Sequence, residues 1–302
     1  MVCNMKIVRH LGTSELPKSE LSKRDQILGL LEERPSWHSG EMMAERLGIS
    51  RAAVAKHVAA LRAAGHGIES VSRRGHRLVV KADDFRVEDV QAHLGTRIFG
   101  KKEWLSFDSI ASTNRQAIIW AAEGAEAGSI VLAEHQTEGR ARKGRHWLSV
   151  PRGIQCSIVL RPSFQEDRIP LLTMLAAVAV TEAIMRCTPL LPRIKTPNDV
   201  LLNGRKICGV LVETGLRASE IEWAVMGIGC NVNAVQVDFA EELQSSASSL
   251  FAESQEPVSR PMLLARILEQ AEFWYDRLQA GEDNTLCQKW EELGGEPFLR
   301  QV

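Results

Sequence analysis

The chain has 302 residues, of which 44% are hydrophobic and 25% charged, with a formal net charge of −1. This length and apolar content allow two domains with buried cores and exclude a chain that is disordered throughout. The charge is unevenly divided: residues 1–82 carry a net charge of +6, and the remainder carries −7. The two parts are therefore expected to meet different partners, and the basic part suggests contact with nucleic-acid phosphates.

The sequence argues against a membrane protein, a secreted protein and a metal-dependent protein. The longest uncharged apolar stretch, residues 169–181, has 13 residues, whereas a membrane-spanning helix needs about 20. The N-terminus lacks the apolar core of a secretory signal, so a cytoplasmic protein without a membrane partner is expected. Six scattered cysteines form no Cys-x-x-Cys pair, which favours reduced thiols and no metal site.

The first 22 residues show no helical or strand periodicity and are expected to form a mobile arm. Apolar spacing then predicts a helix over residues 24–34, ended by Pro35. A second helix begins after Ser39 and ends at Gly48, and Ser50 caps a third over residues 51–64. This helix–Gly–Ile–Ser–helix order is typical of a helix-turn-helix.

Two alternating segments, residues 67–72 and 76–80, surround Arg73-Arg74-Gly75 and predict a basic two-stranded wing. Residues 23–82 are therefore interpreted as a winged-helix DNA-binding domain. A solvated basic face that binds protein remains the alternative. The side chains expected at DNA are Ser50, Arg51, Lys56, His57, Arg62, Arg73 and Arg74.

From Asp83 onward, helical and strand-like segments alternate, which predicts an α+β domain with a central sheet and flanking helices. Three segments in it carry possible chemistry: Ser112-Thr113-Asn114, residues 136–147, and residues 195–199 with 204–209. The middle segment contains four cations and two glycines, a composition that can wrap a phosphorylated ligand. A solvated turn or a nucleic-acid patch would give the same composition, and turn chemistry alone could explain Pro-Asn-Asp and Asn-Gly.

Taken together, the winged helix and the three ordered motifs resemble the family of bifunctional biotin–protein ligases and biotin-operon repressors over residues 24–233. The resemblance implies a class II synthetase-like catalytic domain with a central mixed sheet over residues 83–285. It also implies that residues 286–302 are only the start of a C-terminal β-barrel that is missing or truncated in this chain.

The resemblance further assigns roles to motif positions. Biotin would be held by Ser112, Thr113, Asn114, Gln136, Gly139, Arg140, Arg142, Lys206 and Gly209. ATP would be held by Arg142, Lys143, Arg145, Trp147, Asn198, Asp199 and, from a later Gly-x-Gly-x-Asn segment, Asn231. Lys206, Arg140 and Arg142 would be catalytic, because fixed cations stabilise the charge that gathers when a carboxylate attacks a phosphate.

The expected activity is the formation of biotinyl-AMP from biotin and ATP with Mg²⁺, followed by transfer of biotin to a lysine of a biotin carboxyl carrier protein. Operator DNA and a homodimer formed on adenylate binding are the further expected partners. A non-enzymatic, biotin-sensing regulator is one alternative, and a ligase for another acyl group such as lipoate is the other.

Two positions depart from the family pattern. Ala141 replaces a loop glycine, which would cost about 1 kcal/mol or more if the position needs a positive φ. Thr196 replaces a tryptophan and is expected to loosen the floor of the pocket. Both departures favour the regulator alternative.

Overall fold

The computed structural model describes residues 22–34, 36–81, 85–217 and 220–297. The chain divides into two compact units, one up to residue 83 and one from residue 84. The arm expected over residues 1–22 lies outside the described residues except for Ser22, which caps the first helix by accepting a hydrogen bond from Asp25 N.

The first unit is a winged helix, as predicted. Its elements are α1 (Lys23–Glu33), α2 (Gly40–Leu47), α3 (Arg51–Ala63), β1 (Gly67–Val71) and β2 (Gly75–Val80). The Ser50 hydroxyl accepts from Ala53 N at 3.1 Å, and Gly48 ends α2 with φ +64°. Because the sequence caps both helices of the turn, their hydrophobic sides meet in one core that includes Ile27, Met43 and Val58.

The wing is tied to the segment that precedes α2. His38 and His76 exchange backbone hydrogen bonds of 2.8 and 2.9 Å. Gly75, at the start of β2, has φ +100°, and a β-carbon there would overlap the His38 carbonyl. A glycine is required at this position for both reasons.

The second unit is built on a mixed seven-stranded sheet, which confirms the predicted α+β class. The strand order is β3-β4-β7-β11-β10-β9-β8. The strands are β3 (Trp104–Ile110), β4 (Ile130–Gln136), β7 (Ile154–Leu160), β8 (Arg193–Lys195), β9 (Asp199–Leu202), β10 (Arg205–Arg217) and β11 (Glu220–Cys230). Only β3 and β4 pair in parallel, and the other neighbours are antiparallel.

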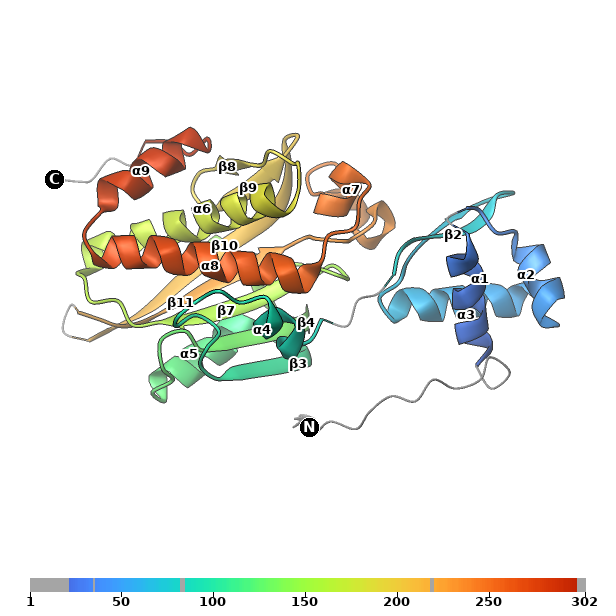
Figure 1. Ribbon diagram of the computed structural model, residues 1–302, viewed down its shortest axis with the longest axis horizontal. Helices are drawn as coiled ribbons and strands as arrows, with labels where there is room; N and C mark the ends of the chain where they lie inside the picture. The colour runs from blue at the N-terminus through green and yellow to red at the C-terminus, as the bar shows by residue number, and fades with distance from the viewer. Residues whose placement is uncertain (1–21, 35, 82–84, 218–219, 298–302) are drawn as a thin grey trace. The chain divides into compact units, whose positions relative to one another are not determined.

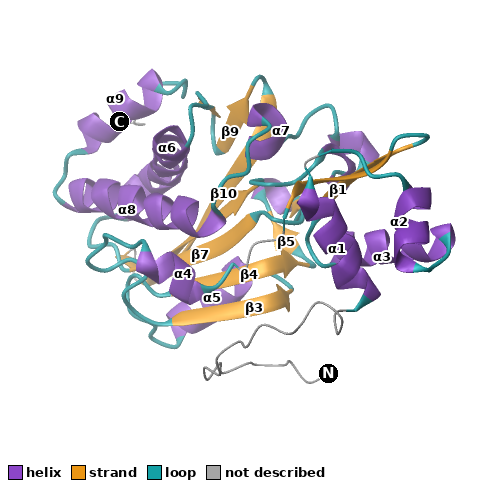
Figure 2. Cartoon of the chain, turned by 45° about the vertical axis from the view of Figure 1, so that its right-hand side comes forward, coloured by secondary structure: helices purple, strands orange, loops and turns teal. Residues whose placement is uncertain are grey.

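Helices cover both faces of this sheet (Figures 1 and 2). One face packs against α6 (Ile169–Cys187), and α8 (Arg260–Gln279) packs on α6 in the same large core. The other face packs against α5 (Thr113–Ala122) through Val131, Val159 and Val225. Since neighbouring strand residues point to opposite faces, the apolar runs of β4, β7 and β11 serve both layers.

Within the described residues, one helical stretch, Glu166–Cys187, is long and apolar enough to cross a membrane. However, 67% of its apolar window is buried inside the fold. This degree of burial is typical of a core helix.

The remaining helices are α4 (Val87–Ala92), α7 (Leu250–Ser254) and α9 (Asp283–Glu292). Helix α9 corrects one prediction, because it occupies the first part of residues 286–302, where the start of a β module was expected. Leu286 and Trp290, one helical turn apart, are both buried and pack in the large core. This spacing matches a helix with one buried side and not an alternating strand.

The wing glycine provides a test of the first unit. We expect Gly75→Ala to lower the free energy of opening this unit by about 3 kcal/mol or more, because backbone strain and overlap with His38 add. Hydrogen exchange of the α3 amides measures this change.

The matched control is Gly48→Ala, where φ is also positive but nothing lies within 4 Å of the added carbon. This control should cost about 1–2 kcal/mol, the strain alone. Equal effects of the two substitutions would contradict the role assigned to the His38 pairing.

Candidate active site and nucleic-acid interface

The floor of the site is the α5 face of the sheet, beyond the point where α5 begins. Register places Ser157 beside Gly227 and Gln155 beside Gly229, on the same face as Val159 and Val225. Small and polar residues thus replace the valines that support α5. The sheet surface is left uncovered beside the N-terminal end of α5, so polar side chains can lie directly on it.

A buried polar network joins the start of α5 to this floor. Thr113 N donates to Gln136 Oε1 at 2.7 Å, and the Ser157 hydroxyl donates to Asn114 Oδ1 at 2.7 Å. Asn114 Nδ2 in turn donates to Glu213 Oε2 at 2.9 Å. A β-carbon at Gly227 would overlap Asn114 Oδ1. The Ser-Thr-Asn segment is therefore fixed in position against the floor.

The glycine–arginine loop folds as a hairpin of β5 (Gly139–Arg140) and β6 (His146–Trp147). Between them, Lys143 has φ +57° and Gly144 φ +70°. Ala141 has φ −137°, an extended conformation that any residue adopts. The strain expected from an alanine at this position is therefore absent, since the left-handed residues of the loop are Lys143 and Gly144.

Trp147 lies flat on the glycine floor. A β-carbon at Gly229 would approach its ring to 2.5 Å, and one at Gly209 to 3.2 Å. The indole Nε1 donates to Gln155 Oε1 at 3.0 Å. Both glycines are needed for this close approach.

Two cations near the floor are paired with carboxylates. Lys206 Nζ lies 2.7 Å from Asp199 Oδ1 and 5.5 Å from the centre of the Trp147 ring. Arg140 lies 2.8 Å from Glu213, whose side chain is 20% exposed. A partly buried pair of this kind keeps a cation in place without a ligand and releases it when a stronger anion arrives.

These residues surround two adjoining cavities, and both are lined by Lys206 and Trp147. The first, named here the central cavity, also contains Ser112, Thr113, Asn114, Gln136, Arg140, Asn198 and Gly209. The second, the outer cavity, also contains Arg145, Asp199, Asn231, Phe239 and Leu243. Lys206 therefore stands where the two cavities meet.

Four of the predicted positions line neither the central nor the outer cavity: Gly139, Arg142, Lys143 and Thr196. Asn198, predicted at ATP, lines the central cavity instead. Arg142 lines a third cavity with Thr196 and Trp290, which shares Val210 and Leu211 with the central cavity. Lys143 lines none of the three cavities. Thr196 accepts a hydrogen bond from Glu296 N at 2.8 Å and does not line the central cavity.

Sequence reasoning missed Glu213, Ser157 and Gln155. The last two stand at alternate positions of an otherwise apolar strand. This alternation of polar and apolar residues is the one sequence signal for Gln155 and Ser157. It indicates a strand with one face in the hydrophobic core and the other face in contact with polar groups. Glu213 carries no such signal, and only the fold brings it to Asn114 and Arg140.

Among the residues that the structure describes, no cysteine lines the central or the outer cavity. Cys156 and Cys208 are fully buried on the α6 side of the sheet. Burial raises the pKa of Cys156 to about 12 and also raises that of Cys208. Among the described residues, no group of three His, Cys, Asp or Glu side chains could hold a metal ion.

In the first unit, the starts of α2 and α3 and the wing enclose an open groove of about 1310 Å³. Arg51, from the start of α3, and Arg73, from the wing tip, both line it. Lys56 is exposed on α3, His57 is half-buried, and Ser50 serves as the helix cap. The groove thus combines free cations with two helix N-termini, a combination suited to phosphates.

Two predicted DNA-contacting cations instead hold the wing. Arg62 donates to Ile68 O at 2.8 Å and to Ser70 Oγ at 2.7 Å, and the Arg74 guanidinium lies 4.8 Å from the centre of the Trp37 ring. His76 lies beside Ser70. Burial, with a smaller contribution from Arg62, lowers the pKa of His76. The imidazole is therefore neutral at neutral pH.

Comparisons with known proteins agree with both units. Residues 106–231 match the biotin/lipoate A/B protein ligase family, and residues 23–77 match a helix-turn-helix domain. The bifunctional ligase/repressor BirA of Bacillus spizizenii is 38% identical over 231 residues, covering 76% of this chain and 71% of that protein. The corresponding protein of Bacillus subtilis is 36% identical, with the same coverage.

A solved structure gives the same result for the fold. The biotin protein ligase of Aquifex aeolicus in complex with biotin and ATP aligns with a TM-score of 0.56 at 27% identity, covering 64% of this chain and 78% of that one. With its helix-turn-helix unit and its ligase fold, the chain belongs to the biotin/lipoate A/B protein ligase family and, within it, to the bifunctional ligase/repressors.

Proposed function

We propose that the chain condenses biotin with ATP to biotinyl-AMP at the junction of the central and outer cavities, and then transfers biotin to a lysine of a biotin carboxyl carrier protein. The chain is a biotin–protein ligase with a repressor's DNA-binding unit. The observation that carries the assignment of the site is the position of Lys206, which lines both cavities.

In this proposal the central cavity holds biotin and the outer cavity holds ATP. Polar groups on Ser112, Thr113 and Asn114 suit the head group of a small acyl compound, and Arg140 suits its carboxylate. The Lys206 ammonium then lies between the attacking carboxylate and the α-phosphate. It stabilises the negative charge that gathers there as pyrophosphate leaves.

The second step needs no nucleophile from the enzyme, because the incoming lysine amine attacks the carbonyl of the mixed anhydride and AMP leaves. The buried cysteines agree with such a direct transfer. Lys206 again balances the charge, now on the departing AMP phosphate.

Mg²⁺ would accompany ATP. Asp199 is the carboxylate of the outer cavity nearest to Lys206, and a single carboxylate with phosphate oxygens is a common magnesium environment. Asp199, Asn231 and Arg145 would orient the nucleotide, and the ion would neutralise phosphate charge.

The repressor function belongs to the groove of the first unit. Arg51 and Arg73 would contact operator phosphates, and exposed side chains of α3 would reach base edges. We place the protein in the cytoplasm without a membrane partner. Binding of the adenylate would promote a homodimer and so link the biotin supply to operator binding.

The central test removes the shared cation. Lys206→Ala should lower kcat/KM for pyrophosphate release from ATP and biotin by about 100-fold or more, because the charge at the α-phosphate loses its fixed partner. Mass spectrometry of an apo carrier domain should show no added biotin.

The control is Lys102→Ala, which removes an exposed lysine paired only with Glu126 at 2.6 Å. This variant should keep full activity. A Lys206→Ala variant as active as the wild type would refute the proposed site. Replacing biotin with lipoate in the same assay tests the other acyl substrate.

DNA binding should respond to a different residue. Arg51→Ala should weaken binding to a mixed-sequence DNA duplex at low salt and reduce the slope of log affinity against log salt by about 1, because one phosphate contact is lost. Fluorescence anisotropy over a salt series measures both quantities, and ligase activity should not change. An unaltered salt slope would mean that Arg51 does not contact phosphate.

Adenylate binding should also change the mass of the protein in solution. Light scattering with ATP and biotin together should report twice the mass of the protein with either compound alone. The same mass in all samples would show that dimerisation does not link biotin supply to DNA binding.

A further inference from the structure

One wall of the outer cavity is a segment without a regular helix or strand of the main sheet. Residues 234–247 form this wall and contribute Phe239 and Leu243 to the lining. A second part of the wall comes from the loop after β6 and includes Leu148 and Val150. Both walls are loops, so the shape of the cavity depends on what holds the two together.

A buried ion pair joins the roots of these loops. Arg152 follows the loop after β6, and Asp238 belongs to residues 234–247. The Arg152 side chain is 2% exposed, and the Asp238 side chain is 14% exposed. Arg152 Nε donates to Asn233 O at 2.8 Å, and Asn233 N donates back to Arg152 O at 3.0 Å. Asp238 also accepts from Val235 N at 2.8 Å. The Arg152 guanidinium and the Asp238 carboxylate therefore hold the first turn of residues 234–247 against the loop after β6.

A small apolar cluster beside this pair is formed by the same two loops. Val150, Ala234 and Phe239 are buried together, and Ala247 packs against them. Val150 and Phe239 also line the outer cavity. Any movement of the segment would thus alter the cavity surface directly.

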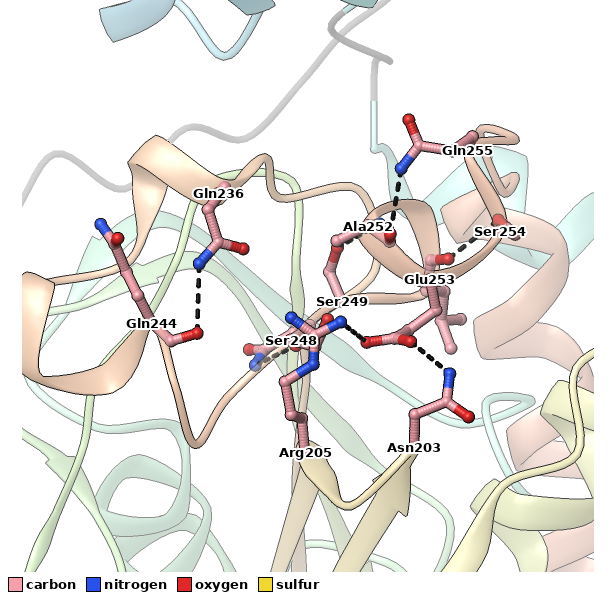
Figure 3. Close-up of polar contacts among 12 residues, drawn as sticks. Asn203, Arg205, Gln236, Gln244, Ser248, Ser249, Ala252, Glu253, Ser254 and Gln255 are labelled. Carbon is pink, nitrogen blue, oxygen red and sulfur yellow. Dashed lines mark hydrogen bonds and ion pairs between the residues drawn. The ribbon is translucent and has the colours of Figure 1, made fainter.

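The far end of the segment is held independently, at the strand that carries Lys206. Lys206 N donates to Ser246 O at 2.8 Å, and Ser248 N donates to Lys206 O at 2.9 Å. Figure 3 shows Glu253 next to this end, with Arg205 and Asn203 directed at its carboxylate. Figure 3 also shows Gln236 donating to Gln244 O, which closes the segment on itself. The near end is held by the Arg152–Asp238 pair and by Ser249 Oγ, which donates to Ala234 O at 2.6 Å.

We propose that Arg152 and Asp238 are positioning residues for ATP: they preset the wall of the outer cavity before the nucleotide binds. Neither residue lines the cavity, so they act through Phe239 and its neighbours. The inference rests on the proposed function, in which the outer cavity holds ATP. Removing one of the two charges takes away the ion pair that joins the two loops, which disfavours the closed segment.

The test measures each substrate separately. Asp238→Asn keeps the size of the side chain and loses its charge. It should raise KM for ATP by about 10-fold or more, with kcat and KM for biotin within about 2-fold of the wild type, because only nucleotide binding depends on the wall. Arg152→Lys keeps the charge and should show a smaller rise than Arg152→Met. Hydrogen exchange of residues 234–247 should be faster in Asp238→Asn without ligand.

The control is Glu126→Gln, which breaks an exposed ion pair of the same unit, with a glutamate side chain 71% exposed. It should leave both KM values unchanged. If Asp238→Asn raises KM for biotin and ATP alike, the pair is merely structural and the inference is overturned. Calorimetry with ATP distinguishes a failure of the proposed function from a failure of this inference. A wild type that binds no ATP overturns the proposed function and the inference together, whereas a variant that binds ATP as the wild type does overturns the inference alone.

Discussion

The site depends on the absence of β-carbons along one short stretch of the sheet. Gly227 lets the Asn114 side chain reach the strand surface, and Gly229 lets the Trp147 ring lie flat on it. On the same face, one residue pair further along the strands, Val159 and Val225 support α5. A change from valine to glycine within one strand therefore converts a packing surface into a binding floor.

Once the floor is open, the positions of the charges follow from the strands beside it. Gly209 pairs with Gly229. Lys206, on the same strand β10, places its Nζ over the Trp147 ring, 5.5 Å from the ring centre. Asp199 at the start of β9 holds the ammonium at 2.7 Å. A cation held by one carboxylate is available to a more highly charged anion, because phosphate oxygens can replace that partner. This arrangement explains how one lysine can serve two adjoining cavities.

Much of this was predictable from the sequence, since local signals are strong in the first unit. The caps at Ser39 and Ser50 and the glycine at position 48 predicted its helices within a residue or two at most ends. The seven-strand order was not predictable, because pairs such as Gly229 with Gln155 depend on long-range packing. For the same reason, the ion pair of Arg140 with Glu213 carried no sequence signal. Motif order indicated which residues belong to the site, but not that Arg142 and Lys206 line different cavities.

The two departures from the family pattern argue for the enzyme over the regulator once their geometry is known. Ala141 is extended, so its methyl group carries no backbone strain. Thr196 is engaged with Glu296 N outside the central cavity. Neither substitution removes a polar group from the floor or alters the Lys206 pair. A chain that only sensed biotin would not need a cation that lines both cavities. The position of Lys206 is the physical reason to expect chemistry at this site.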